Sequence, residues 1–568
     1  MKDEILKSFL ATFIEQNDLS EVDEDEAFEN FVNYNIVSRL YPRDVDFEVL
    51  STGGSDDLAI DGAAIIVNGN IVTSVDEIDY LLERNGTLDV TFALIQSKNS
   101  PKFKGEQVGN FIFGVKSFFD DEPSLPENDR ISKLRVLKEE IYKKSIHFEE
   151  SPELKLFFVT TGSWKEPDQI KGKARRELRE IDERSLFNNE AAIEFYDAER
   201  LKSTYRELSR KSVKEIPFNN HVALPDMPEA LNVRQSFLGS ISVESYLDLI
   251  TNSDGNLSKE LFYDNVRDYQ GSNKVNREIA ETLNSSTRQA LLPLLNNGIT
   301  VIAKKVDKIG SKLKLTDFQV INGCQSSHVL FEHRDLISPN SQIILKIIDT
   351  NDQDVINDII RAANRQTEVK DEAFESLKPF HKDLEEFYKA KASRVSPPIY
   401  YERRSKQYLG HPKVKPYQVV TLASQVKSYV ATVLEQPQST HRYFGELLDS
   451  NKGKLFNKKA NFEKYYLSSL IMNRLDNATK NHKIPKKSKK FKFHIAFLTY
   501  KLLLKQSSKG NSLEEALDTA SNRNDIQPLF EKSVGIIEQA LHSSKKHRRD
   551  AERSRDFTSI LRDLVETV

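Results

Sequence analysis

Short apolar runs alternate with longer amphipathic stretches through the first 210 residues of the chain. Apolar runs of strand length form a sheet, and helices placed between them cover its faces. This alternation restricts the region to an α/β fold. The elements that we expect, in order, are a helix over 24–40, strands over 47–50, 60–75 and 92–98, a helix over 105–119, a strand over 155–164, a helix over 166–181 and a strand over 191–201.

The whole chain, at 568 residues, is too long for one hydrophobic core. The stretch 217–232 has three prolines and little periodicity, which is typical of a domain boundary. We therefore expect an α/β domain over 1–215, an α+β region over 216–415 and a mainly helical, locally basic region over 416–568.

Composition excludes several classes of protein. The formal charge of -4 gives no global signature of nucleic-acid binding, so charge must be assessed locally. The single cysteine, Cys324, excludes an internal disulfide and a cysteine-rich zinc site. The N-terminal segment lacks the pattern of a signal peptide, and no run of 18 apolar residues occurs. We expect a soluble, cytoplasmic protein with no membrane partner.

The strand over 92–98 ends in polar residues. Side chains two apart on a strand share a face, so Gln96 and Lys98 lie side by side while Ser97 faces away. Asp61 begins the preceding strand, and it can meet Gln96 if the two strands are neighbours. A carboxylate and an amide oxygen suit a hard cation, Mg²⁺ or Mn²⁺. Lys98 can orient an attacking water or hold a phosphate.

Other interpretations of these residues stay open. Gln96 and Lys98 alone can simply end a strand at solvent, with Asp61 capping a turn. Asp56 or Asp57 takes the place of Asp61 if the strand begins earlier, although their position in a Gly-Gly-Ser-Asp-Asp stretch favours turn formation.

The pattern resembles the restriction-endonuclease-like PD-(D/E)xK nucleases, and more closely their Mrr-like branch, in which a glutamine replaces the usual acidic residue. The matching segments are Phe28-Glu29, Ile60-Asp61 and Ile95-Gln96-Ser97-Lys98, within about residues 20 to 200. The resemblance implies an αβββαβ core, catalysis by Asp61, Gln96, Lys98 and Glu29, and metal ligation by Asp61, Gln96 and Glu29. Because Gln96 removes one negative charge, it also leaves room for an inactive scaffold.

A second constellation of amide-rich motifs lies in the central region. Residues 318–321 form an apolar strand, Asn322-Gly323 is a turn, and a helix opens at Gln325. A strand that enters a glycine turn before a helix exposes backbone N–H groups, which suits an anion. Arginine side chains can add phosphate contacts. The candidate ligand-binding residues are Arg267, Asn297, Asn322, Gln325 and Arg365.

These segments resemble the AIPR family, which is named for abortive infection and phage resistance. Its hallmark is an apolar strand followed by Asn-Gly-x-Gln and small hydroxyl residues, here residues 321–327. Further matches, in the family's order, are Asn265-Val266-Arg267, Asn296-Asn297-Gly298-Ile299-Thr300, Asn364-Arg365-Gln366-Thr367 and Tyr401-Glu402-Arg403-Arg404. The resemblance implies bacterial defence against phage, without a settled chemistry for the Asn-Gly-x-Gln segment.

The amides of this second constellation have two interpretations. They either fix buried backbone and loop geometry or line a pocket for a nucleotide, a nucleic acid or a phage product. Cys324 is expected to be a small buried residue and not a nucleophile, because no His/Asp pattern accompanies it.

Two basic stretches occur near the C-terminus. Residues 480–492 contain seven lysines and no acid, and 545–555 form a second cluster. Such clusters suit the phosphate backbone of nucleic acid, although a solvated surface has the same composition.

Taken together, the motifs predict a metal-dependent endonuclease of phage defence, with DNA preferred to RNA as substrate and a phage-derived trigger. The alternatives are a non-catalytic nucleic-acid or nucleotide sensor on the same scaffold, and an RNase. A homodimer is an expectation from function alone, since nucleases that cut both strands often act as dimers.

Overall fold

The computed structural model of the protein describes residues 1–567 apart from 42–44, 124, 210–211, 253–254, 263–273, 365–374, 377, 404–406, 410, 458–459, 508–511 and 544–550. Two compact units divide the chain. One contains Met1–Asp3, Val32–Val72 and Leu81–Ala373, and the other contains Glu4–Phe31, Thr73–Tyr80 and Phe374–Val568. Each unit is made of several separate segments of the chain, so this division does not test the predicted boundaries at 215/216 and 415/416. Those boundaries stay predictions.

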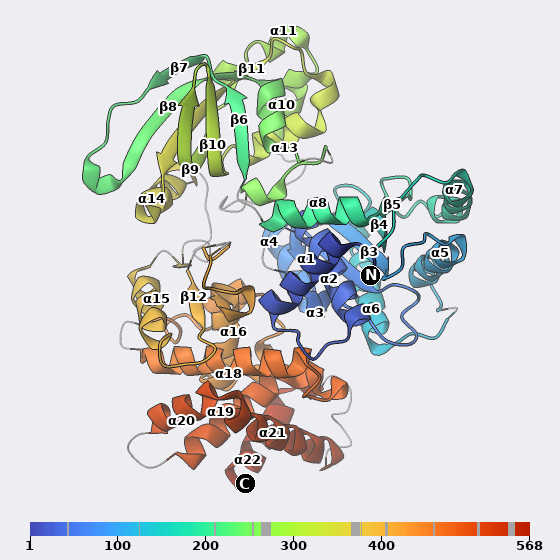
Figure 1. Ribbon diagram of the computed structural model, residues 1–568, viewed down its shortest axis with the longest axis vertical. Helices are drawn as coiled ribbons and strands as arrows, with labels where there is room; N and C mark the ends of the chain where they lie inside the picture. The colour runs from blue at the N-terminus through green and yellow to red at the C-terminus, as the bar shows by residue number, and fades with distance from the viewer. Residues whose placement is uncertain are drawn as a thin grey trace. The chain divides into compact units, whose positions relative to one another are not determined.

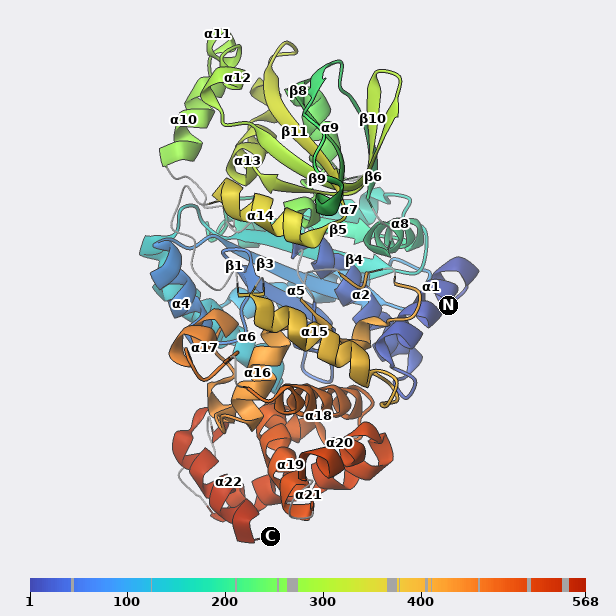
Figure 2. The same ribbon diagram turned by 90° about the vertical axis from the view of Figure 1, so that its left-hand side faces the viewer.

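A five-stranded sheet forms the first part of the first unit (Figure 2). Its strand order is β2-β1-β3-β4-β5, with β1 antiparallel to β2 and β3, and with β3, β4 and β5 parallel. Strand β3 is central and almost continuously buried, as expected for a strand covered on both faces. The elements are α2 (Glu24–Leu40), α3 (Phe47–Leu50), β1 (Gly62–Val67), β2 (Asn70–Ile71), α4 (Val75–Asn85), β3 (Val90–Lys98), α5 (Gly105–Phe119), α6 (Asp129–Lys143), β4 (Glu153–Thr160), α7 (Asp168–Asp182), β5 (Ile193–Tyr196) and α8 (Ala198–Ser209). Helices α2 and α4 are divided between the units, since residues 24–31 and 75–80 belong to the second.

The structure confirms that helices and strands are mixed in this region, but it adds α4 between β2 and β3 and α6 between α5 and β4, which the apolar pattern did not predict. Three of the expected segments also need a local correction. The segment 47–50, predicted as a strand, is a single helical turn, because Asp46 accepts the N–H of Glu48 and caps it. The run 60–75 divides at Asn68-Gly69, which both have positive φ and form a tight hairpin turn. The run 191–201 changes from β5 to α8, because Asp197 accepts the N–H of Arg200 at 2.9 Å.

A strained loop leads into Asp61. Asp56, Leu58 and Ala59 have positive φ angles of 60°, 59° and 54°, a conformation that costs a non-glycine residue about 1–3 kcal/mol. Helix α5 holds this loop closely, since a Cβ on Gly114 would lie 1.6 Å from the backbone oxygen of Leu58. The glycine in α5 therefore permits the approach that fixes the backbone before Asp61.

A six-stranded sheet forms the second part of this unit. Its order is β6-β10-β9-β11-β8-β7, and only β9 and β11 pair in parallel. Residues 217–232, predicted as a domain boundary, contribute the end of edge strand β6 and all of edge strand β7. The elements are β6 (Val213–Pro217), β7 (Asn220–Ala223), β8 (Val233–Ser242), α9 (Val243–Ile250), α10 (Lys274–Leu283), α11 (Ser286–Gln289), α12 (Leu292–Leu295), β9 (Ile299–Ile309), β10 (Lys312–Asn322), α13 (Cys324–Glu332), β11 (Gln342–Thr350) and α14 (Gln353–Asn364) (Figure 1).

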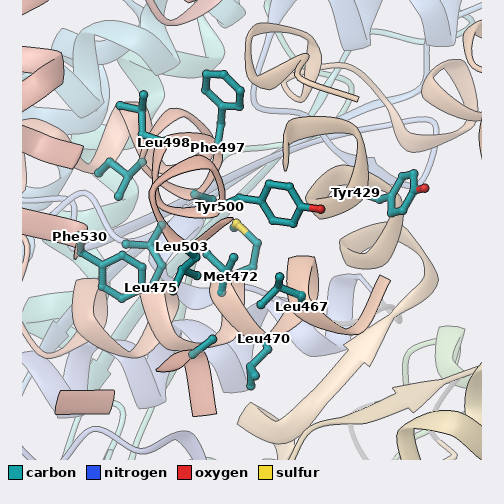
Figure 3. Packing of buried hydrophobic residues seen from close by; sticks show 14 of the residues in the cluster. Tyr429, Leu467, Leu470, Met472, Leu475, Phe497, Leu498, Tyr500, Leu503 and Phe530 are labelled. Atoms are coloured by element: carbon teal, nitrogen blue, oxygen red, sulfur yellow. The ribbon is translucent and has the colours of Figure 1, made fainter. Parts of the chain in front are cut away.

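The second unit is mainly helical, as predicted for the C-terminal region. Side chains of α18, α19 and α21, such as Met472, Leu503 and Phe530, meet in its core (Figure 3). No described helix has the length and apolarity that a membrane span requires. The elements are α1 (Glu4–Asn17), α15 (Pro379–Lys391), β12 (Tyr400–Glu402), β13 (Val419–Thr421), α16 (Leu422–Thr432), α17 (Phe444–Ser450), α18 (Phe462–Lys480), α19 (Lys492–Gln506), α20 (Ser512–Ser521), α21 (Arg523–Ser543) and α22 (Arg555–Thr567).

Candidate functional site

Asp61 lies where the amino end of β1 meets the carboxyl end of β3. Its backbone N–H donates to the carbonyl of Ile95 at 2.8 Å, which extends the antiparallel ladder by one residue. The register pairs Gly62 with Ile95, so Asp61 faces the polar end of β3. The Asp61 side chain is 4% exposed. Pairing of the two strands thus brings a buried carboxylate to the Gln-Ser-Lys segment.

One oxygen of Asp61 collects the contacts. Asp61 Oδ2 accepts hydrogen bonds from the Gln96 amide and from the backbone N–H and hydroxyl of Ser97, the latter two at 2.8 and 3.3 Å. Lys98 Nζ lies 3.6 Å from the same oxygen, and the Lys98 side chain is one-third exposed. Among the described residues, no hydrogen bond reaches Oδ1. One carboxylate oxygen is therefore held in place, while the other accepts no hydrogen bond from the described residues.

Ser97 differs from its predicted orientation. We expected it to face away from the site, yet its backbone N–H and its hydroxyl both contact Asp61. The expectation rested on strand alternation. However, Asp61 comes one residue before Gly62, the first paired residue of β1, and its side chain contacts Ser97 at the end of β3. A small hydroxyl residue between two candidate site residues was the signal in the sequence.

Burial raises the pKa of Asp61 above its usual value, against the opposing effects of Lys98 and of the hydrogen bonds from Ser97 and Gln96. Burial also raises the pKa of Asp57, and the nearby negative charge of Asp61 raises it further. The two carboxylates therefore interact, and each is harder to ionise than an exposed aspartate.

We expect Asp61→Asn to stabilise the folded protein at neutral pH. A raised pKa means that protonation of Asp61 favours folding, so this contribution is fully present below pH 3.8 and is lost as pH rises through the folded-state pKa. The gain in unfolding free energy from the substitution should be largest at neutral pH and should vanish at low pH. Thermal unfolding at several pH values measures it, with the exposed Asp56→Asn as control. A variant less stable than wild type at neutral pH would contradict this expectation.

The other carboxylates considered for the site are Asp56, Asp57 and Glu29. Asp57 Oδ1 accepts the N–H of Ala59 at 2.8 Å, which is the turn-forming role considered for it, while Asp56 is exposed. From α2, Asn33 donates to the carbonyl of Asp61 at 3.2 Å. Glu29 is half-buried one turn before Asn33 in the same helix, and its role as a metal ligand stays a prediction.

The described side chains of this site offer few oxygen ligands to a hard cation. Asp61 Oδ1 is available, and Gln96 would add its amide oxygen once its amide turns over, because it now donates its N–H to Asp61. In the described part of the chain, no group of three or more His, Cys, Asp or Glu side chains is placed to hold a metal ion. Mg²⁺ keeps several waters and needs only one or two carboxylates from a protein, so this set is compatible with it.

The Asn-Gly-Cys-Gln segment has the predicted local structure. Strand β10 ends at Asn322, Gly323 has φ 97°, and α13 begins at Cys324. Gln325 accepts an amide hydrogen bond from Asn276 at 2.8 Å. Cys324 is buried in the core of the six-stranded sheet, which agrees with the expected small buried residue.

The hydroxyls of this segment hold the turn together. Ser326 accepts from the amide of Asn296 at 2.8 Å, and Ser327 donates to the carbonyl of Gly323 at 2.7 Å. Tyr246 lies 2.6 Å from the Ser327 hydroxyl. These bonds favour the interpretation in which the motif fixes loop geometry.

The candidate ligand-binding residues of this region are only partly described. Asn297 is exposed, and Asn322 and Gln325 are half-buried. Arg267 and Arg365 lie outside the described residues, as do the motifs 265–267 and 365–367. The ligand-binding role of all five stays a prediction.

We expect Gly323→Ala to lower the free energy of unfolding by about 1–3 kcal/mol, because the positive φ strains alanine and overpacking adds to that strain. An added Cβ would lie 2.7 Å from Ile299 Cγ1. Gly310→Ala is the matched control, since it also has positive φ but has no atom within 4 Å of the added Cβ. Chemical denaturation compares the two, and an equal effect in both would show that the contact with Ile299 does not matter.

The basic stretch over 480–492 is largely neutralised by carboxylates within the second unit. Four of its lysines form ion pairs, and 545–550 of the second cluster lie outside the described residues. The pairs are Lys483–Glu21 at 2.8 Å, Lys487–Glu538 at 2.6 Å, Lys490–Glu552 at 3.9 Å and Lys492–Asp476. This pairing reduces the net positive charge that the stretch could offer to nucleic acid.

The described chain is a mixed α/β protein with a helical C-terminal region. The sequence model of the family described as AIPR protein matches residues 262–545, half of the chain. The chain therefore belongs to the AIPR family, as its motifs predicted, and membership suggests abortive-infection defence against phage. Comparison with curated proteins and with solved structures finds no match.

Proposed function

We propose that the protein is a metal-dependent nuclease that cuts DNA in abortive-infection defence. The observation that supports this most is the convergence of Asp61, Gln96 and Lys98 at the adjoining ends of β1 and β3. The Mrr-like resemblance assigns catalysis to the same three residues. The AIPR region would sense a phage-derived trigger or position the substrate.

In this proposal the side chains divide the work. Asp61 Oδ1 and the amide oxygen of Gln96 would hold Mg²⁺ or Mn²⁺, and the bound ion would polarise the scissile phosphate and ease deprotonation of water. Ser97 fixes Asp61 through Oδ2, so the free oxygen keeps one direction. Lys98, partly exposed and 3.6 Å from Asp61, can hold a phosphate oxygen or orient the attacking water.

A non-catalytic sensor of nucleic acid or nucleotide is the second candidate. The hydrogen bond from the Gln96 amide to Asp61 supports it, because this bond satisfies Asp61 within the protein and leaves the site with little negative charge. An RNase on the same scaffold is a third candidate, and the substrate used in the assay separates it from the first.

The test is incubation of the purified protein with duplex DNA, single-stranded DNA and RNA, each with Mg²⁺, with Mn²⁺ and with EDTA. Cutting of DNA that requires the metal and stops in EDTA is the expected result. Cutting of RNA alone would favour the RNase. Tight binding without cutting under every condition would favour the sensor.

A further inference from the structure

Two loops leave the five-stranded sheet at the carboxyl ends of β3 and β4, where Asp61, Gln96 and Lys98 lie. Strands β3 and β4 are parallel and pair Lys98 with Thr160, so residues 99–104 and 161–167 both follow carboxyl ends at this edge. Thr161 N–H donates to the carbonyl of Ser100 at 3.1 Å and ties the loops together. In α/β sheets, ligands bind outside the carboxyl ends of parallel strands.

These loops carry positive charge that the protein does not neutralise. Residues 98–105 contain three lysines and no carboxylate. Lys102 and Lys104 of the first loop and Lys165 of the second are exposed, and in the described part of the chain they form no ion pair. Glu166, next to Lys165, is paired with Lys171 at 2.8 Å. The lysines of 480–492 show the opposite pattern, since most of them meet a carboxylate.

The position of Lys104 also opposes fold stability. It is the N-cap residue of α5 and makes no capping hydrogen bond through its side chain. A cation at a helix N-terminus is disfavoured by the helix dipole, at a cost of about 0.3–1 kcal/mol near a surface. Neither helix capping nor ion pairing accounts for this lysine, whereas a bound anion would be favoured by both the lysine and the dipole.

Aromatic packing holds the lysines in place. Phe103, between Lys102 and Lys104, packs on Trp164 with ring centroids 4.6 Å apart, and Trp164 stacks on Phe195 at 4.0 Å. The backbone N–H of Trp164 donates to Asp197 at 3.0 Å. Lysines on such a braced support lose less freedom when they bind a ligand than lysines on a loose loop.

We propose that Lys102, Lys104 and Lys165 form a rim that grips the phosphate backbone of nucleic acid beside Asp61 and Lys98. The proposal rests on the proposed nuclease function, since it assigns the rim to the phosphates that flank the cut. Such contacts position the substrate without reading its sequence. An acidic protein segment is the competing occupant, and the test below separates the two.

The experiment compares two triple variants that remove the same charge. One is K102Q/K104Q/K165Q in the rim, and the matched control is K483Q/K487Q/K490Q in the ion-paired stretch. Binding of labelled duplex DNA is measured in EDTA by fluorescence anisotropy over a series of salt concentrations, with polyglutamate as a competitor. Thermal unfolding of both variants checks that they are folded.

We expect the rim variant to bind DNA about 100-fold more weakly near 0.1 M salt. The slope of its log affinity against log salt concentration should flatten by about 0.9 for each phosphate that the rim no longer neutralises. The control should bind nearly as wild type does. Unchanged binding by the rim variant, an equal weakening in the control, or absence of DNA binding by the wild type would overturn the proposal. Competition by polyglutamate as strong as that by unlabelled DNA would also overturn it, in favour of an acidic partner.

The test of the rim is separable from the test of the proposed function. EDTA prevents metal-dependent cutting but leaves the contacts between the lysines and the phosphate backbone of DNA. Rim-dependent binding without any cutting in metal would support the rim and refute the nuclease. Metal-dependent cutting with binding insensitive to the rim would do the reverse.

Discussion

Asp61→Asn should lower metal-dependent cutting of DNA by about 1,000-fold or more, since loss of several kcal/mol of metal-assisted stabilisation costs a factor of ten per 1.36 kcal/mol. The substitution keeps the shape of the side chain and an acceptor for Ser97, so the loop and strand ends stay in place. It removes the buried negative charge that lies 3.6 Å from Lys98 Nζ. Initial rates with Mg²⁺ and with Mn²⁺, at equal protein concentration, measure the effect.

Two companion variants sharpen this result. Lys98→Ala should also abolish cutting, because it removes the cation that holds a phosphate oxygen or a water. Asp56→Asn, in the same loop but exposed, should cut at the wild-type rate. If Asp61→Asn retains full activity, or if all three variants cut equally, the activity belongs to another site or to a contaminant.

Asp57→Asn separates the remaining alternative for the ligand. If Asp57 serves only the turn, the amide oxygen of asparagine still accepts the N–H of Ala59, and cutting should change little. A decrease as large as that of Asp61→Asn would make Asp57 a second carboxylate of the site.

Gly114→Ala should lower the free energy of unfolding of the first unit by about 3 kcal/mol, the upper range for overpacking in a core. The added Cβ would lie 1.6 Å from the backbone oxygen of Leu58, and backbone cannot move aside as a flexible side chain does. Either α5 or the strained loop before Asp61 must shift. Cutting should therefore fall together with stability.

The control for this prediction is Gly172→Ala in α7, another helical glycine, whose added Cβ has no atom within 4 Å. Alanine favours a helix by about 1 kcal/mol over glycine, so this variant should be as stable as wild type or more stable. Thermal unfolding followed by circular dichroism compares the two. Similar behaviour of both variants would show that the contact between α5 and the loop is not tight.

Local patterns were sufficient for much of the fold. The helical spacing over 105–119 became α5 because a 3.6-residue period reports which face of a helix is buried. The apolar run before Gln96 became β3 because a short continuous apolar run is typical of a strand covered on both faces. The prediction of a strand over 47–50 was wrong because four residues are too few to show a period. The side chain of Asp46 caps this segment and stabilises a helical turn. The AIPR motifs were identifiable for a different reason, since they are short, ordered and specific.

By itself, the sequence determined that Asp61, Gln96 and Lys98 would lie at adjoining strand ends if the strands paired, and that the chain carries AIPR motifs. Only the tertiary structure decided that Ser97 turns toward Asp61, and that, within the described residues, four lysines of 480–492 pair with carboxylates while Lys102, Lys104 and Lys165 do not. The physical reason is that strand and helix periods are local, whereas hydrogen bonds and ion pairs such as Lys483–Glu21 join residues far apart in the chain. Whether a charged residue adds net charge to the surface therefore depends on the side chains that folding places beside it.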